Sequence, residues 1–148
     1  MSAAATPEVS HRGTCFCQAS SVQLRGDPVA ASFCHCSTCR RLSGAPYMAI
    51  ALAPLSCVVM TGPTSEVLST SDKVVRYRCS LCHSPLAAIL AGKTVALPIG
   101  LFDFPGGAPP SWRPQHHMYY SQRTFDVLDG LPRYEASTRG KLWEPPAS

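Results

Sequence analysis

The spacing of the cysteines constrains this chain more than any other feature. Seven of the eight fall in three short clusters: Cys15 and Cys17, then Cys34, Cys36 and Cys39, then Cys79 and Cys82. Closely spaced thiols on tight turns are a common zinc-binding pattern, because zinc accepts tetrahedral thiolate coordination. The eighth, Cys57, stands alone in an apolar run, where a free cysteine usually acts as a small buried hydrophobe. The clusters therefore predict metal sites.

The start of the chain favours reduced thiols over disulfides. Residues 1–10 contain neither a basic nor an apolar segment, so no signal peptide is expected. The longest mostly apolar stretch, Ala45 to Met60, is interrupted by Pro46 and Pro54 and is too short to span a bilayer. We therefore expect a cytoplasmic protein, with a nuclear location also open and no membrane partner. Cysteines in these compartments stay reduced and are available to bind metal.

The length of the chain limits the number of domains, and its net charge limits the kinds of partner that are expected. A chain of 148 residues is one domain on ordinary size statistics. We expect a disordered lead over residues 1–12, a zinc domain over 13–136 and a C-terminal tail over 137–148. The net charge is only +4, and the longest basic run is Arg40-Arg41, so no nucleic-acid partner is expected. The sequence does not fix an oligomeric state.

The hydrophobic pattern predicts an all-β domain with little helix. Short apolar or alternating runs are bounded by turn residues, and no long segment has the helical period. One helical turn is expected at 40–43, before Gly44 and Pro46. Strands are expected around Val22 and Leu24 and over residues 29–33, 47–52, 56–60, 66–70, 74–78, 85–90, 95–99 and 118–121.

The seven clustered thiols divide naturally into four and three. Cys15, Cys17, Cys79 and Cys82 can close a structural site, whose metal-binding energy would contribute to folding. Cys34, Cys36 and Cys39 would hold a second zinc with one position left, which a catalytic zinc needs. The residues alone leave two alternatives open. Water, His35 or another residue could fill the fourth position without reaction, or the chain could hold one metal beside several idle thiols.

Motifs along nearly the whole chain resemble one known family, the glutathione-dependent formaldehyde-activating enzymes, also called the centromere protein V type. The motifs are Gly13-x-Cys15-x-Cys17, Cys34-His35-Cys36-x-x-Cys39-Arg40-Arg41-x-Ser43-Gly44, Cys79-x-x-Cys82-x-x-Pro85-Leu86, Leu97 to Asp103, His117-Met118-Tyr119-Tyr120 and Asp129 to Tyr134. The family usually has glycine where this chain has Gln18 and His83. It also has a tryptophan where this chain has Thr124-Phe125.

The resemblance implies a β-rich zinc fold of coiled antiparallel sheets, like that of the mammalian suppressor of Sec-four. It implies two zinc ions per chain, a structural one on Cys15, Cys17, Cys79 and Cys82, and a catalytic one on Cys34, Cys36 and Cys39. The implied activity is that of a carbon–sulfur lyase, joining formaldehyde and glutathione to S-(hydroxymethyl)glutathione. A thiol such as glutathione is therefore the expected small-molecule partner.

Three further residues are candidates for the catalytic site. Glutathione is anionic and would be repelled by a zinc with three thiolates, so Arg40 and Arg41 are expected to offset the charge and bind carboxylates. They could equally be solvated flanks of the turn. His35 is a candidate acid, base or hydrogen-bond donor beside the metal, or a residue pointing out of the turn.

Two other functions remain open from the sequence. A non-catalytic, zinc-stabilised module that binds protein or chromatin would need the fourth position of the second zinc closed by a side chain. A redox sensor would release metal-bound thiolates on oxidation. Metal content and the occupancy of that fourth position separate the enzyme from these alternatives.

Overall fold

The computed structural model describes residues 11–67 and 71–148, and short strands dominate it. In chain order the elements are β1 His11–Thr14, β2 Ser21–Leu24, β3 Ala30–Cys34, α1 Ser37–Ser43, β4 Met48–Pro54, the 3-10 turn η1 Leu55–Cys57, β5 Val58–Thr61, β6 Thr64–Glu66, β7 Val74–Cys79, β8 Pro85–Leu90, β9 Thr94–Pro98, η2 Ile99–Leu101, η3 Pro110–Trp112, β10 His117–Met118 and η4 Tyr120–Gln122. The predicted β-rich fold with a minor helix is confirmed.

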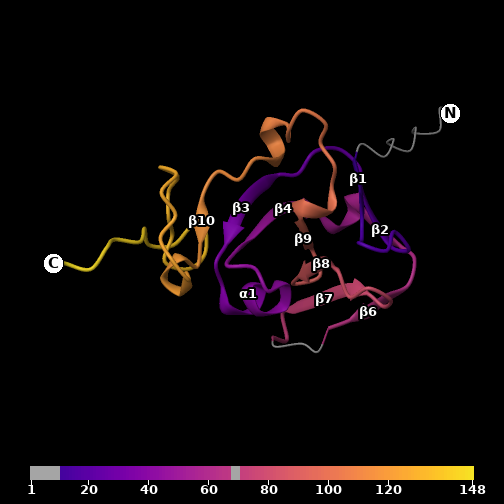
Figure 1. Cartoon of the computed structure of the whole chain (residues 1–148), viewed down its shortest axis with the longest axis horizontal. Helices are drawn as coiled ribbons and strands as arrows, with labels where there is room; N and C mark the ends of the chain where they lie inside the picture. The colour runs from indigo at the N-terminus through magenta and orange to yellow at the C-terminus, as the bar shows by residue number, and fades with distance from the viewer. Residues whose placement is uncertain (1–10, 68–70) are drawn as a thin grey trace.

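Among the described residues the strands form two sheets. The smaller has the order β1-β2-β5, and the larger has the order β10-β3-β4-β9-β8-β7-β6. Neighbouring strands pair antiparallel, except that β10 runs parallel to β3. Figure 1 shows β1 and β2 on the opposite side of the molecule from β10 and the C-terminal segment. The first described strand therefore lies in the smaller sheet and the last in the larger sheet, on opposite sides of the molecule.

The larger sheet uses its two faces differently, because successive side chains of a strand point to opposite faces. One face supplies Ala51, Ala53, Val95 and Leu97 to a hydrophobic core that also contains residues of the smaller sheet, such as Leu24. The opposite face carries the alternate residues of the same strands. These residues form the wall of the cavity described below.

The helix is longer than predicted. It begins at Ser37 rather than residue 40, because the thiol of Cys36 accepts a hydrogen bond from the Cys39 backbone N–H at 3.3 Å and so caps the first turn. At the other end Gly44 adopts φ 71° and donates its N–H to the Arg40 carbonyl oxygen, which stops the helix as expected.

Several boundaries also differ from the sequence-based expectation. The strand expected at 118–121 is confined to His117–Met118, because Tyr119 has φ 53° and leads into η4. The strand expected at 56–60 begins only at Val58, after η1. Of the strand expected at 66–70, residues 68–70 lie outside the described residues, as do residues 1–10 of the expected lead.

The ends of the expected zinc domain join regular structure. His11 and Arg12, placed by sequence in the lead, belong to β1. Within the expected tail, Trp143 donates its N–H to the Arg133 carbonyl oxygen at 2.8 Å, and its ring packs on Tyr120 with centroids 4.9 Å apart. Among residues 11–67 and 71–148, no helix combines the length and the apolar character that crossing a membrane requires.

Candidate metal centres and the adjoining cavity

The first candidate metal centre joins the beginning of the chain to its middle. Its four thiols, Cys15, Cys17, Cys79 and Cys82, have sulfur atoms within 4.8 Å of one another. The Sγ atoms of Cys15 and Cys17 are 3.6 Å apart, and those of Cys17 and Cys79 are 3.8 Å apart. A tetrahedron with zinc–sulfur bonds of about 2.3 Å has an edge of roughly 3.8 Å. The group could hold a metal ion, and its spacing fits zinc.

Hydrogen bonds to backbone and hydroxyl groups position these thiols. The Ser20 N–H donates to the Cys15 sulfur at 3.3 Å, and the Ser84 hydroxyl lies 3.2 Å from the Cys82 sulfur. The hydrogen bond with Ser84, followed by backbone hydrogen bonds, lowers the pKa of Cys82 to about 5. Ser84 also accepts the N–H of Phe16 at 3.1 Å, so one hydroxyl contacts both turns. This network favours the deprotonated form of Cys82, which is the form that binds metal.

The two turns that carry these thiols have the same backbone shape. Gln18 and His83 have φ values of 65° and 64°. Each donates its N–H at 3.0 Å to a carbonyl oxygen of the thiol turn, that of Cys15 for Gln18 and that of Cys79 for His83. The left-handed region disfavours side chains with a Cβ, so these are positions that suit glycine. They are the same two positions at which the chain departs from the family pattern.

The second candidate metal centre lies where β3 ends and α1 begins. Cys34 is the last residue of β3, Cys36 caps α1, and Cys39 lies in its first turn. Their three sulfur atoms lie within 4.8 Å of one another. Strand end, cap and first turn thus explain why C-x-C-x-x-C spacing brings three thiols together. This trio, Cys34, Cys36 and Cys39, could hold a metal ion.

The trio has no fourth ligand residue in the part of the chain that the structure describes. No histidine, cysteine, aspartate or glutamate there joins the three sulfurs. Mutual hydrogen bonding with the other two thiols lowers the pKa of Cys36, and hydrogen bonds to Cys36 and Cys39 raise that of Cys34. Cys36 is therefore the first of the three to ionise. The sequence-based alternative that His35 closes the site is not what the structure has.

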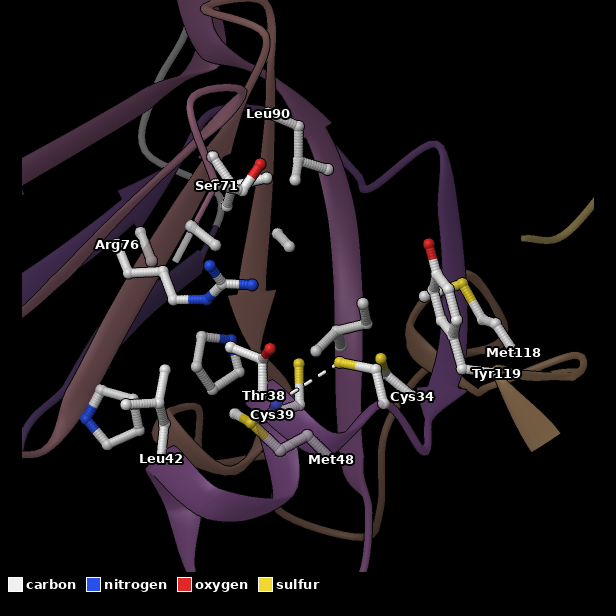
Figure 2. Close-up of a pocket in the computed structure, with 18 of the residues that line it drawn as sticks. Cys34, Thr38, Cys39, Leu42, Met48, Ser71, Arg76, Leu90, Met118 and Tyr119 are labelled. Carbon is white, nitrogen blue, oxygen red and sulfur yellow. Dashed lines mark hydrogen bonds between the residues drawn. The ribbon is translucent and has the colours of Figure 1, made fainter. Parts of the chain in front are cut away.

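A cavity of about 890 Å³ opens directly on the trio. All three cysteines line it, together with Thr38 and Leu42 of α1 and alternate residues of the larger sheet. Figure 2 shows Arg76 directed from β7 toward the trio, with Leu90 at the far end of the cavity and Tyr119 at the side. A ligand in the cavity can therefore contact sulfur, guanidinium and apolar groups at once.

The cavity is cationic. Arg76, Arg78 and Arg139 line it, and none of the aspartates and glutamates in the described part of the chain does. None of the ion pairs among the described residues involves these three arginines. The Arg78 Nε atom is buried and has no hydrogen-bond partner. Charged groups in such a setting are normally paired, so the arrangement favours an anionic ligand.

The structure places Arg40 and Arg41 away from this cavity. Both line a separate depression beside Thr124 and Phe125. Arg40 donates from Nε to the His35 carbonyl oxygen at 3.2 Å. The reason is the helical period: Thr38, Cys39 and Leu42 take the face of α1 that lines the cavity, and residues 40 and 41 are turned from it. Adjacency in sequence to Cys39 does not bring an arginine to the trio's open side.

His35 is buried behind the trio and does not line the cavity. Its Nε2 lies 2.9 Å from His117 Nδ1, and His117 Nε2 lies 2.8 Å from Asp129 Oδ2. Since a carboxylate only accepts, His117 Nε2 donates to Asp129; in the neutral tautomer that this fixes, His117 Nδ1 accepts from His35 Nε2. Burial, followed by the nearby His117, lowers the pKa of His35 to about 4. His35 is thus a neutral buried donor that ties β3 to β10.

Tyr119 is one of the cavity-wall residues to which sequence reasoning gave no role. It follows β10 and has φ 53°, in a backbone region that residues other than glycine rarely adopt. Burial, followed by the charges of Cys34, Cys36 and Cys39, raises the pKa of its hydroxyl. It therefore offers a protonated hydroxyl to the cavity at neutral pH. The motif His117-Met118-Tyr119-Tyr120 carried the signal, but a regular strand would not have turned this residue.

The chain is similar to known proteins in its fold and in its sequence pattern. Comparison with curated proteins gave no match. A crystal structure of a Rhodobacter sphaeroides protein is similar, with 22% sequence identity and a TM-score of 0.50, over 67% of this chain and 91% of that chain. That likeness concerns the fold. The model of the family described as glutathione-dependent formaldehyde-activating enzyme matches residues 10–122. This match covers most of the chain, and the chain therefore belongs to that family.

Proposed function

We propose that this protein is a zinc-dependent enzyme of the carbon–sulfur lyase type, which joins a thiol such as glutathione to formaldehyde and catalyses the reverse reaction. The observation that carries the proposal is the trio. Three thiols without a fourth ligand residue among the described residues face a large cationic cavity. A reducing compartment such as the cytoplasm would keep these thiols available for metal.

The residues present fit two zinc ions with different roles. Cys15, Cys17, Cys79 and Cys82 would hold a structural ion, since four thiols complete its coordination. Cys34, Cys36 and Cys39 would hold the other on the wall of the cavity. When bound there, zinc supplies Lewis-acid chemistry and favours the thiolate form of a thiol. The protein then has to bring substrate to this wall and control charge and protons around it.

Arg76 is our candidate for binding the substrate's carboxylates. It lies on β7 facing the trio, and its positive charge helps to lower the pKa of Cys36. Glutathione carries carboxylates that a guanidinium can bind through two parallel hydrogen bonds. Holding the peptide in this way would bring its thiol and the aldehyde carbon together, which replaces a bimolecular encounter by a positioned one.

Tyr119 is our candidate for the proton on the oxygen side. As the thiol sulfur attacks the aldehyde carbon, the carbonyl oxygen gains negative charge and must take up a proton. The Tyr119 hydroxyl stays protonated because its pKa is raised. It can donate to that oxygen and regain a proton from solvent. We expect Tyr119→Phe to lower the rate about 100-fold or more and to leave the metal content intact.

The proposal is tested by metal analysis combined with NMR exchange measurements on formaldehyde and glutathione. We expect two zinc ions per chain and exchange between free and adduct-bound formaldehyde that is faster with the protein than without it. Cys39→Ser should lose one zinc and the acceleration together. A protein with both zinc ions and unchanged exchange would contradict the proposal and would favour a non-catalytic binding module.

A further inference from the structure

The second hydrophobic cluster of the protein is hollow. Its buried members are Cys34, Ile50 and Ala96, with Met48, Leu52, Ala88, Leu90, Met118 and others packed against them. Every one of these residues also lines the cavity. The side chains of Leu52, Ala88 and Leu90 are only partly buried, so the apolar surface that they turn to the cavity has not gained the full stabilisation that burial from water provides. The wall is therefore suited to an apolar group supplied by a ligand.

The sheet register shows how this space arises. Arg76 pairs with Ala88, Ala88 pairs with Ala96, and Ala96 pairs with Leu52, on four consecutive strands. Residues directly opposite one another share a face of the sheet, so these four form one row across the cavity wall. Two alanines occupy the middle of the row. Their small side chains create the depth, and Leu52 and Leu90 bound it.

The row is polar at one end and apolar at the other. Arg76 and Arg78 of β7 supply guanidinium groups at one end, whereas Ala96 of β9 and Ile50 and Leu52 of β4 offer hydrocarbon only. Glutathione placed over the hydrocarbon side would leave carboxylates and amides without partners, each at a cost of binding. This places the peptide at the Arg76 end of the row and leaves the surface of Ala88, Ala96 and Leu52 for another group.

Formaldehyde does not fill that remaining space. The cavity's 890 Å³ is near the upper end of the range of about 300–1,000 Å³ for small-molecule sites. A one-carbon aldehyde has no hydrocarbon group to place against Ala88 and Ala96. The aldehyde that matches the wall is one with an apolar substituent several carbons long.

We propose that the preferred aldehyde of this protein carries an aliphatic or aromatic substituent that binds over Ala88 and Ala96. This inference rests on the proposed function and specifies its substrate class. In the reaction the thiol sulfur bonds to the aldehyde carbon, the carbonyl π bond breaks, and the thiol proton ends on the oxygen. The product is a hemithioacetal of glutathione, and no oxidant or reductant takes part.

Binding of S-alkylglutathiones by isothermal titration calorimetry tests the inference without turnover. From S-methyl- to S-hexylglutathione we expect the Kd to fall by about fourfold for each methylene buried, which amounts to roughly 1,000-fold when all five added methylenes are buried. Ala88→Leu should remove most of this gain, because leucine fills the middle of the row. Val75→Leu is the matched control: Val75 is exposed on β7, does not line the cavity, and the variant should keep the gain.

Exchange rates for a series of aldehydes with glutathione separate this inference from the proposed function. We expect greater acceleration for hexanal than for formaldehyde. Acceleration for formaldehyde that does not increase with chain length, together with equal Kd values for the S-alkylglutathiones, would overturn the inference alone. The absence of acceleration with every aldehyde would overturn the proposed function and this inference together. Metal content and thermal unfolding of Ala88→Leu confirm that the variant is folded.

Discussion

Gln18 and His83 stand at the corners of the two turns that hold the four-thiol group, both with left-handed backbone and both donating to a cysteine carbonyl oxygen. A residue with a Cβ costs roughly 1–2 kcal/mol there. Glycine removes this strain but loses more backbone freedom on folding, about 0.5–1 kcal/mol. The chain therefore carries strain directly beside a candidate metal centre.

Replacing either residue by glycine is expected to stabilise the zinc-loaded protein. We predict a gain of about 0.5–1 kcal/mol in the free energy of unfolding for Gln18→Gly and for His83→Gly, measured by urea unfolding. Gln23→Gly is the control with the opposite sign, because Gln23 lies in β2, where glycine weakens a strand. A loss of stability in both turn variants would contradict the argument from backbone strain.

A second prediction at the residue scale compares Arg76, which lines the cavity, with Arg41, which does not. Arg76→Gln should raise the glutathione concentration needed for half-maximal acceleration about tenfold or more, because a charged hydrogen bond is worth about 1.5–3 kcal/mol. Arg41→Gln should have little effect, since Arg41 lies outside the cavity. The reverse pattern would support the assignment made from sequence adjacency to Cys39.

At the scale of elements, features that depend on local sequence patterns could be predicted, and features that depend on strand pairing could not. The C-x-C-x-x-C spacing predicted the trio, and Val95 to Ile99 predicted β9, because both are local patterns. The first turn of α1 was missed because a cysteine caps it. Arg76 and Ala88 were missed because their shared row depends on strand pairing, which no local pattern encodes.

His117 and its neighbour provide a matched test of the β3–β10 junction. His117→Phe leaves the Nε2–H of buried His35 without an acceptor, and we expect a cost of about 2–3 kcal/mol in urea unfolding. His116→Phe should cost less than about 1 kcal/mol, because half-buried His116 loses one hydrogen bond, to Thr138. Equal effects for the two variants would show that the His35–His117–Asp129 chain has no special role.

At the scale of the whole molecule, the four-thiol group connects distant parts of the chain, and the trio does not. The four-thiol group connects the turn after β1 with the end of β7, elements that are far apart in sequence and belong to different sheets. The trio draws on one continuous stretch from β3 to α1. Loss of the first should therefore disturb the fold, and loss of the second should disturb only the site.

Single substitutions distinguish these roles. We expect Cys79→Ser to give a protein without a cooperative unfolding transition and with little bound zinc, because apparent binding free energies of structural zinc reach about 10–16 kcal/mol. Cys39→Ser should stay folded and retain one zinc ion per chain. Metal analysis and amide NMR spectra of both variants provide the measurement. A folded Cys79→Ser variant with native-like spectra would refute the structural role assigned to the four-thiol group.

Ala88 and Ala96 set the depth of the cavity, yet neither belongs to a thiol group or to the core between the two sheets. A change at partly buried Ala88 alters the cavity without removing a thiol or a residue of the core between the two sheets. Under the proposed aldehyde preference, substrate choice can therefore drift by single mutations at Ala88 in descendants of this protein, while both groups of thiols are inherited unchanged.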